Sequence, residues 1–404
     1  MEEKVKLIKD PIHGYIQINE EERRIIDSAP FQRLRRICQL PFANLVYPGA
    51  NHTRFSHSLG CFYIAGEIVE KLKLEEYNKK VVKIAALLHD IGHPPFSHLC
   101  EQFLFEYKTN HEEMTKKIIS ENEELASAIE KSGVSIKDVI AILEGKKPES
   151  SIVTGPIDSD KLDFLIRDSY YTGASYGIID IKRLIHMMKL IGNKIAINIR
   201  ALGVVEEFAL ARLQSFINIY YHHAVRAAQL LFVSAIKKEG IKNLLSLEIE
   251  DYLNEDDYTL WCKLKNSKKA LPYVKRIEKR LLPKMAFETH LSAEKFSFSM
   301  LNEEDVRKQI ERKIANIAGI DEEKIWIDTP YIAPIPLSLS HETPFYKEED
   351  GEVKIVEVKS PFFEPFAQIY NILRIYTENE YRSQVEKAAK KFFEPLPEIE
   401  RISL

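Results

Sequence analysis

The sequence is poor in cysteine and lacks any long hydrophobic run. Its four cysteines, Cys38, Cys61, Cys100 and Cys262, stand far apart in 404 residues, without the close spacing of a zinc site or a redox pair. We expect them to be reduced and mostly buried, as in a cytosolic protein. No apolar stretch approaches the roughly 20 residues that cross a membrane, and the N-terminus is charged from Glu2 onward. The sequence therefore indicates neither secretion nor membrane insertion, and it favours a cytoplasmic location.

A strong excess of positive charge is also absent. The chain has 57 basic and 61 acidic residues, a net charge of −4. Such a balance gives no general attraction for nucleic acid, so any surface that binds nucleic acid has to be local. The one candidate stretch, Lys263 to Lys284, is basic, but charged helices are usually just solvated faces. A non-catalytic nucleic-acid-binding module is therefore possible but not favoured.

Hydrophobic periodicity predicts a mainly α protein with an appended α+β region. Over residues 1–240 apolar residues recur at intervals of three and four, which is typical of packed helices. Farther along, Lys324–Asp328 and Val353–Val358 alternate as strands do, and a last helix is expected from Glu378 to Phe393. We expect a helical core over residues 1–240 and a structural or oligomerisation region over residues 241–404. The helices predicted in the core cover residues 20–28, 31–39, 57–72, 80–89, 112–120, 160–168, 181–190 and 204–238.

The segment HDIGHPPFSH, residues 89–98, is the densest group of chemically active side chains. It follows the apolar stretch 81–88, so its three histidines and one aspartate should gather at the end of a buried helix. His89 and His93 are four residues apart and are expected on one helix face, with Gly92 and the following prolines ending the helix. A transition metal takes four to six nitrogen or oxygen ligands, so other segments must complete any shell here.

Two other segments supply suitable ligands. NHTRFSHSLG, residues 51–60, places Arg54 three residues before His57. DSDKLDFLIRD, residues 158–168, follows the helix start signal Gly-Pro and places Asp160 on one helical stripe. Two neutral imidazoles favour iron, manganese, nickel, zinc or cobalt, while magnesium is possible when a substrate phosphate completes the shell. The predicted metal ligands are His57, His89, Asp90 and Asp160.

This order, a histidine, then adjacent His-Asp, then a distant aspartate, resembles the HD superfamily of metal-dependent phosphohydrolases. Within it the chain is similar to the deoxynucleoside triphosphate triphosphohydrolases. The resemblance runs from about Lys6 to about Lys237, through DPIHGYI, FQRLRRICQL, YPGANHTRFSHSLG, LLHDIGHPPFSH, NHEE and DSDKLDFLIRD. It implies an HD-domain helical core, a divalent metal, and hydrolysis of dNTPs to deoxynucleoside and triphosphate. The alternative is an HD-type phosphohydrolase that acts on nucleoside monophosphates or phosphodiesters.

The resemblance also implies how the phosphates are held. Arg54, His98 and the metal would bind the α-phosphate, and Lys161 with Arg212 would bind the β- and γ-phosphates. Cations so placed offset the charge that develops on the leaving polyphosphate. An enzyme for monophosphates or phosphodiesters would not need the last two cations.

By the same resemblance, His111 and Glu112 in NHEE match a catalytic histidine and its supporting acid. His111 would protonate the leaving oxygen, and Glu112 would fix its tautomer and raise its pKa towards neutrality. His93 is expected as a further contact to the metal shell or to a phosphate. These three residues complete the predicted catalytic set.

Sugar recognition is implied by a third group of matches. Gln39 and Asp168 match positions that bind the 3′-hydroxyl, and Leu40 with Tyr220 match positions packed against the 2′ carbon. A ribose hydroxyl would clash there, which selects deoxyribose. Phe164 departs from the family pattern, where tyrosine is common, so its ring can stack but brings no hydroxyl.

A second nucleotide site is suggested at a subunit interface, where relatives bind an activating guanine nucleotide. The chain would then be a homo-oligomer, a tetramer before a dimer, that responds to GTP or dGTP. A lattice of surface salt bridges is the competing interpretation. Asp10, His13 and Tyr15 are expected only to cap an N-terminal hairpin. The residues that match the activator site are Lys6, Leu7, Asp27, Gln32, Arg35 and Arg183.

Overall fold

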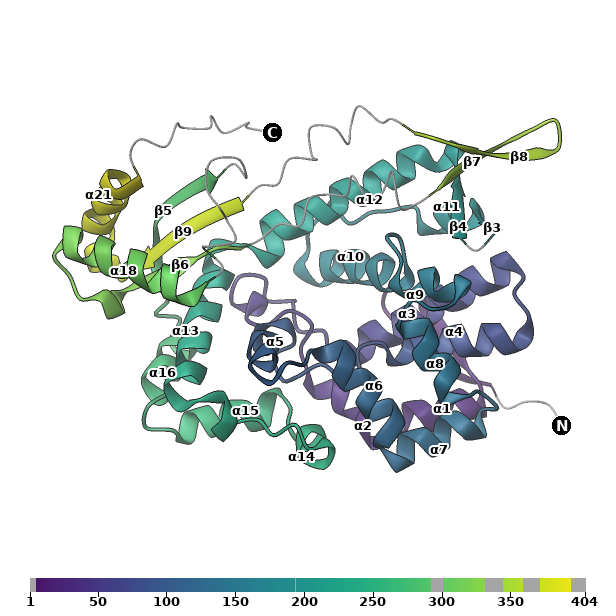
Figure 1. Ribbon diagram of the computed structural model, residues 1–404, viewed down its shortest axis with the longest axis horizontal. Coiled ribbons are helices and arrows are strands. Elements are labelled where there is room, and N and C mark those ends of the chain that lie inside the picture. The colour runs from purple at the N-terminus through teal and green to yellow at the C-terminus, as the bar shows by residue number, and fades with distance from the viewer. Residues whose placement is uncertain are drawn as a thin grey trace.

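The structure, a computed structural model, describes residues 5–192, 194–291, 301, 303–330, 344–358 and 371–393. Most of this chain is helical, and its strands form three small sheets. Figure 1 shows a large helical body with a smaller unit of helices and strands at one end. The N-terminal elements are β1 (Lys6–Asp10), β2 (Gly14–Ile18), α1 (Glu20–Ile26), α2 (Ala29–Arg33), α3 (Arg54–Leu72), α4 (Glu76–Leu88), α5 (His98–Leu104), α6 (His111–Glu121), α7 (Glu123–Lys131), α8 (Ile136–Leu143), α9 (Ser151–Thr154), α10 (Ser159–Thr172) and α11 (Ile181–His186).

The helical body is built around α3, which packs against both α4 and α10. On α4, Val81, Ala85 and Leu88 recur at the spacing of one helix face and are buried. The body continues through β3 (Met188–Ile191), β4 (Lys194–Asn198), α12 (Leu202–Ser215), α13 (His223–Glu239), α14 (Ile249–Asn254), α15 (Asp257–Asn266) and α16 (Leu271–Glu278). Its hydrophobic core includes residues from Ile16 on β2 to Ile277 on α16. The predicted boundary at residue 240 coincides with the end of α13, but the core continues past it.

The C-terminal part has a core of its own. β5 (Lys284–Leu291), β9 (Asn371–Thr377) and β6 (Ile325–Asp328) form an antiparallel sheet in that order, covered by α18 (Glu304–Ala318) and α21 (Arg382–Phe393). β7 (Phe345–Glu349) and β8 (Glu352–Val356) instead extend the β3-β4 hairpin, through parallel pairing of β4 with β7. The predicted helical core with an appended α+β region is therefore confirmed.

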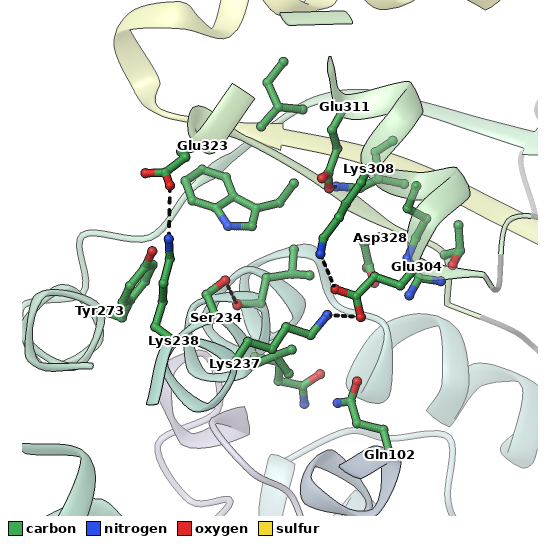
Figure 2. Close-up of a pocket in the computed structure, with 18 of the residues that line it drawn as sticks. Gln102, Ser234, Lys237, Lys238, Tyr273, Glu304, Lys308, Glu311, Glu323 and Asp328 are labelled. Atoms are coloured by element: carbon green, nitrogen blue, oxygen red, sulfur yellow. Dashed lines mark hydrogen bonds and ion pairs between the residues drawn. The ribbon is translucent and has the colours of Figure 1, made fainter. Parts of the chain in front are cut away.

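The C-terminal unit is attached to the body by ion pairs across a cleft of about 860 Å³. Figure 2 shows two neighbouring lysines of α13 reaching across it. Lys237 Nζ lies 2.7 Å from Glu304 Oε2, and Lys238 Nζ lies 3.0 Å from Glu323 Oε1. Glu304 also pairs with Lys308 at 3.0 Å. The pairs made by Lys237 and Lys238 link α13 to the C-terminal unit, so the side chains of this cleft contribute to the attachment of that unit.

Three predicted helices are shorter or interrupted, and the one expected over residues 31–39 ends as α2 at Arg33, followed by a 3₁₀ turn at Leu34–Arg36. The single helix expected over residues 204–238 is wrong: α12 gives way to a π-helical turn at Phe216–Tyr220, and α13 begins only at His223. The His222 side chain accepts a hydrogen bond from the Ala224 N–H and starts α13 anew. The helix expected over residues 181–190 ends at His186, after which β3 begins. Among the described residues, no helix is both long and apolar enough to span a membrane.

Candidate metal centre and active site

Three separate helices bring the four predicted metal ligands together. His57 comes from the first turns of α3, His89 and Asp90 follow the last residue of α4, and Asp160 lies in the first turn of α10. His57 Nε2 is 3.0 Å from Asp160 Oδ1 and 3.6 Å from Asp90 Oδ2. His89 Nε2 is 3.3 Å from Asp90 Oδ1 and 3.6 Å from Asp160 Oδ1. The His57, His89 and Asp160 ligand atoms therefore lie close enough together to hold one ion, Asp90 contacts both histidines, and Cys61 Sγ, which the sequence did not point to, joins this group 3.5 Å from His57 Nε2.

The end of α4 differs from the sequence-based expectation. α4 stops at Leu88, His89 is its C-cap, and His93 lies outside any helix, so the two histidines do not share a helix face. The backbone instead turns twice, with the Ile91 N–H donating to Leu88 O and the His93 N–H donating to Asp90 O. Gly92 makes this turn possible, because a Cβ there would lie 2.2 Å from Thr115 N. The turn directs both side chains toward the same cavity by a different route.

Protonation and hydrogen bonding at the centre suit a divalent cation. His89 Nδ1 donates to Ala86 O at 2.8 Å, whereas its buried Nε2 has no hydrogen-bond partner among the residues that the structure describes. Burial alone would raise the pKa of Asp160, but His57 and His89 hold it well below its ordinary value. Burial likewise opposes the charge on His57, yet nearby Cys61, Asp160 and Asp163 raise its pKa well above its ordinary value. A divalent cation bound here would replace the positive charge of the protonated imidazoles, and their protons would be released when the metal binds. Nitrogen and carboxylate donors in this ratio fit the predicted metals.

His57 is held from behind by residues for which the sequence analysis assigned no such role. Its Nδ1 donates to Asp163 Oδ2 at 2.8 Å, which leaves Nε2 for the metal site. Arg167 donates to both oxygens of Asp163, and His13 lies 2.7 Å from Oδ1. Gly60 allows this packing, since a Cβ there would lie 1.8 Å from Asp163 Oδ1. A carboxylate on the far nitrogen of a ligating histidine is a common way to orient it.

His93, His98 and His111 form a second cluster beside the predicted metal ligands. The rings of His93 and His111 stack with centroids 4.1 Å apart and an angle of 10°. Parallel rings cannot both direct in-plane lone pairs at one ion, so we do not interpret this cluster as a second metal site. Glu101 Oε2 accepts from His98 Nδ1 at 2.7 Å, and its Oε1 accepts from His111 Nδ1. Burial would raise the pKa of Glu101, but the bonds to His111 and His98 hold it well below its ordinary value.

Glu101 thus occupies the position that the sequence analysis gave to Glu112. Glu112 is exposed and lines the cavity, while the hydrogen bond to His111 comes from Glu101 on α5. The physical reason is local: consecutive residues in a helix do not face each other, so Glu112 on α6 is poorly placed to fix the ring of His111. The role of Glu112 itself stays a prediction.

We predict that Glu101→Gln lowers turnover without removing the metal. The amide presents an N–H₂ group to one of the two imidazoles that Glu101 now accepts from, so the ring orientation of His98 or His111 is lost. Turnover should fall by roughly 10- to 100-fold, within the range of general acid–base contributions. Steady-state assays combined with elemental analysis of bound metal test this. Glu106→Gln, the same substitution at an exposed position outside the cavities that hold the predicted catalytic and substrate residues, is the control, and an unchanged rate in Glu101→Gln would contradict the assignment.

The predicted substrate residues line two adjoining cavities. One of about 380 Å³ contains His89, Asp90 and Asp160 as well as His93, His98, His111 and Glu112. The other, of about 500 Å³, opens beside it. Its lining includes Gln39, Leu40, Lys161, Phe164, Asp168, Arg212 and Tyr220. The two cavities share Gln39, Arg54, His98, Lys161 and Phe164.

Several of these side chains are already paired. Arg54 donates to Asp90 Oδ2 at 2.6 Å, and Lys161 Nζ donates to Asp158 Oδ2 at 2.6 Å. Tyr220 donates to Asp168 Oδ2 at 2.6 Å. These bonds hold the two cations and the Asp168 carboxylate in position around the cavities.

Residues of the predicted activator site lie on the N-terminal elements, with one exception. Lys6 and Leu7 are exposed on β1. Gln32 accepts from Arg35 Nε at 2.8 Å, and the Arg35 guanidinium lies 3.5 Å from the centre of the Phe55 ring. Asp27 accepts from Arg23 at 3.0 Å. Arg183 stands elsewhere, on α11, where it donates to Arg200 O at 3.1 Å. Binding of a nucleotide by this group stays a prediction.

The helical body, with a histidine, a His-Asp pair and a distant aspartate at one point, defines an HD domain. Residues 54–151 match the HD domain model, and residues 179–401 match the model of the HD associated region. The chain belongs to this HD family of metal-dependent phosphohydrolases.

Three similar proteins are informative, and two of them match nearly the whole chain. An uncharacterized protein of Methanocaldococcus jannaschii is 34% identical over 407 residues, which are 96% of this chain and 84% of that protein. The crystal structure of a hypothetical protein from Aquifex aeolicus has a TM-score of 0.79 and 31% identity, covering 96% of this chain and 100% of that one. A homolog of the deoxynucleoside triphosphate triphosphohydrolase SAMHD1 from Dictyostelium discoideum is 29% identical over 322 residues. That match covers 73% of this chain and 62% of the Dictyostelium protein.

Proposed function

We propose that the protein hydrolyses deoxynucleoside triphosphates to a deoxynucleoside and triphosphate. The observation that carries this proposal is the continuity of the site. The metal-ligand cavity and the cavity that contains Lys161, Arg212 and Asp168 share five residues, so one ligand can contact both. A match to the Dictyostelium homolog, whose name gives this activity, supports the same substrate class.

The phosphate end of the site has the charge that a triphosphate needs. When bound at His57, His89, Asp90 and Asp160, a divalent ion supplies a Lewis acid for a phosphoryl oxygen. Lys161 and Arg212 extend positive charge away from the metal ligands into the second cavity. Burial opposes the charge on Lys161, but Asp158 and Asp160 raise its pKa above its ordinary value, so it remains cationic. In this proposal the two cations bind the β- and γ-phosphates, which a monophosphate lacks.

The part of the second cavity that would hold the sugar is lined by both polar and apolar side chains. Gln39 lies in the lining of both cavities, and its buried Oε1 finds no hydrogen-bond partner in the described part of the chain. A sugar 3′-hydroxyl would supply the missing donor, which removes the cost of a buried unpaired acceptor. Asp168 is fixed by His52 at 2.8 Å and by Tyr220 at 2.6 Å. Tyr220 and Leu40 line the same cavity, and in this proposal they pack against the 2′ carbon of the sugar, which would favour deoxyribose.

Protonation of the leaving 5′-oxygen falls to His111 in this proposal. Its Nδ1–H is bound by ionised Glu101, so Nε2 can carry the transferable proton. The same hydrogen bond orients the ring toward the cavity, as a general acid requires. Arg54 and His98 are available for the α-phosphate, because both line the two cavities.

The test is a substrate panel with product separation. Each dNTP, each NTP, the deoxynucleoside monophosphates and a phosphodiester are incubated with the protein and Mg²⁺, Mn²⁺ or Co²⁺. We expect deoxynucleoside from dNTPs, much less product from NTPs, and none from monophosphates. Hydrolysis of monophosphates or the phosphodiester in preference to dNTPs would contradict the proposal and support the alternative HD phosphohydrolase. Lack of hydrolysis with all metals would support a non-catalytic protein.

We further propose a homo-oligomer, a tetramer before a dimer, whose activity increases with GTP or dGTP. A ligand that binds in a site completed by a second subunit stabilises the assembly, and its binding is linked to the activity of that assembly. GTP should raise the hydrolysis of other dNTPs, and Asp27→Ala should remove the stimulation while metal content stays normal. Glu21→Ala on the same helix is the control. Light scattering that shows a monomer fully active without GTP would contradict both parts, and an active oligomer indifferent to GTP would contradict the regulatory part.

A further inference from the structure

The N-terminal β1-β2 hairpin reaches the rear of the metal centre. At the turn between its strands, Asp10 Oδ1 accepts from the N–H groups of Ile12 and His13, both at 2.9 Å. Gly14, with φ of 75°, completes the turn in a conformation that favours glycine. The turn fixes the backbone of His13 and directs its ring toward α10, where Nε2 lies 2.7 Å from Asp163 Oδ1. The hairpin thereby contacts the carboxylate that holds His57.

Asp163 is saturated with donors and closed in on every side. Its Oδ2 accepts from His57 Nδ1 at 2.8 Å and from Arg167 Nε at 2.8 Å, and its Oδ1 accepts from Arg167 at 2.9 Å and contacts His13. Arg167 in turn donates to Asp10 Oδ2 at 2.8 Å. Asp163 and Arg167 are fully buried, and Asp10 is 4% exposed. A closed ring of contacts, Asp10 to Arg167 to Asp163 to His13 and back to Asp10, therefore surrounds the support of a metal ligand.

We propose that Asp10 and His13 are positioning residues of the metal centre, which fix Asp163 so that His57 presents Nε2 to the metal. The inference rests on the predicted metal ligand His57 and not on the identity of the substrate. Without the His13 donor, Asp163 Oδ1 keeps only its bond from Arg167, and the carboxylate is held less firmly. The ring angle of His57 is then less well fixed, which is the usual reason that outer partners of ligating histidines affect metal affinity.

A purely structural hairpin would behave differently. A mutation in such a hairpin would lower the stability of the metal-free protein, but the folded variant would bind metal with unchanged affinity. The ring of His13 also stacks on Tyr63, with centroids 4.8 Å apart. A substitution that keeps an aromatic ring but removes the donor therefore separates packing from positioning.

The experiment compares His13→Phe, His13→Gln and His186→Phe in the full-length protein. Phenylalanine keeps the ring beside Tyr63 and removes the donor, whereas glutamine keeps an N–H donor near the position of Nε2. His186 lines the same outer cavity of about 490 Å³ as His13 but is exposed and has no contact with Asp163 among the interactions of the described residues. Affinity for Co²⁺ is measured by competition with a chromophoric chelator, the visible spectrum of bound Co²⁺ reports its ligand geometry, and thermal unfolding of the metal-free protein reports stability.

We expect His13→Phe to bind Co²⁺ about 10- to 100-fold more weakly with an altered visible spectrum. His13→Gln should recover most of the affinity, and His186→Phe should match the wild type. Wild-type affinity and spectrum in His13→Phe would overturn the proposal. Where His13→Phe does not fold, Asp10→Asn replaces it, since the amide oxygen still accepts from the turn but the ionic partner of Arg167 is gone. Unchanged affinity in that variant would also overturn it. None of these outcomes depends on which nucleotide is hydrolysed.

Discussion

Replacing both residues of the His-Asp pair, His89→Ala with Asp90→Ala, should abolish metal binding and hydrolysis together. The two side chains supply a nitrogen and a carboxylate to a centre in which His57 Nε2 lies only 3.0 Å from Asp160 Oδ1. Removing them leaves two of the four predicted ligands, His57 and Asp160, with Cys61 as the other donor beside them, fewer than a transition metal usually takes in a protein. Elemental analysis after dialysis should find no stoichiometric metal, and activity should fall to the background rate.

The fold should survive that double substitution. Both residues follow α4 and are not part of its apolar face, so circular dichroism should remain that of a mainly helical protein. The exposed-site variant His186→Ala is the matched control and should keep both metal and activity. Full metal content in the double variant would show that the ion binds elsewhere and would remove the basis of the site.

Replacing His111 by alanine should lower turnover by roughly 10²- to 10⁴-fold, the usual contribution of a general acid. The metal should be retained, because the metal ligands do not include this residue. The difference from the double variant is therefore diagnostic: one loses the ion, the other only the proton donor. Pre-steady-state measurement of deoxynucleoside formation, in quenched reactions at saturating metal, gives the rate of the chemical step.

The control for His111→Ala is Glu113→Ala, an exposed residue on the same helix turn. Glu113 pairs with Lys116 at 2.6 Å on the solvent side, and its loss should change the rate little. A normal rate in His111→Ala would move the acid elsewhere, with His93 as the next candidate by position.

The chemistry was more predictable from sequence than the supports that orient it. His57, His89 and Asp160 could be grouped because each stands in a segment rich in polar side chains beside an apolar helix. By contrast, Asp10 and His13 sit 150 residues or more from Asp163, and their sequence suggested only a capped hairpin. Contacts of that separation leave no local periodicity, so they emerge only when the fold is known.

Local geometry explains two differences between the sequence-based expectations and the structure near the site. Adjacency in the sequence pointed to Glu112 as the partner of His111, yet helix geometry directs consecutive side chains to different faces, and the hydrogen bond to His111 comes from Glu101 on α5. The end of α4 was placed too late because the spacing of His89 and His93 imitates a helix. The tight turn at Gly92 brings the same side chains to the site without one. Helix boundaries are set by such caps, which depend on residues from other elements.

The most direct test of the central claim is ³¹P NMR of the products formed from a single dNTP with bound metal. Hydrolysis of the bond between the 5′-oxygen and the α-phosphorus consumes one water and yields deoxynucleoside and intact triphosphate. The account predicts the signals of triphosphate, without orthophosphate or pyrophosphate, and loss of all product when a chelator removes the metal. Appearance of a deoxynucleoside mono- or diphosphate with pyrophosphate or orthophosphate would contradict it.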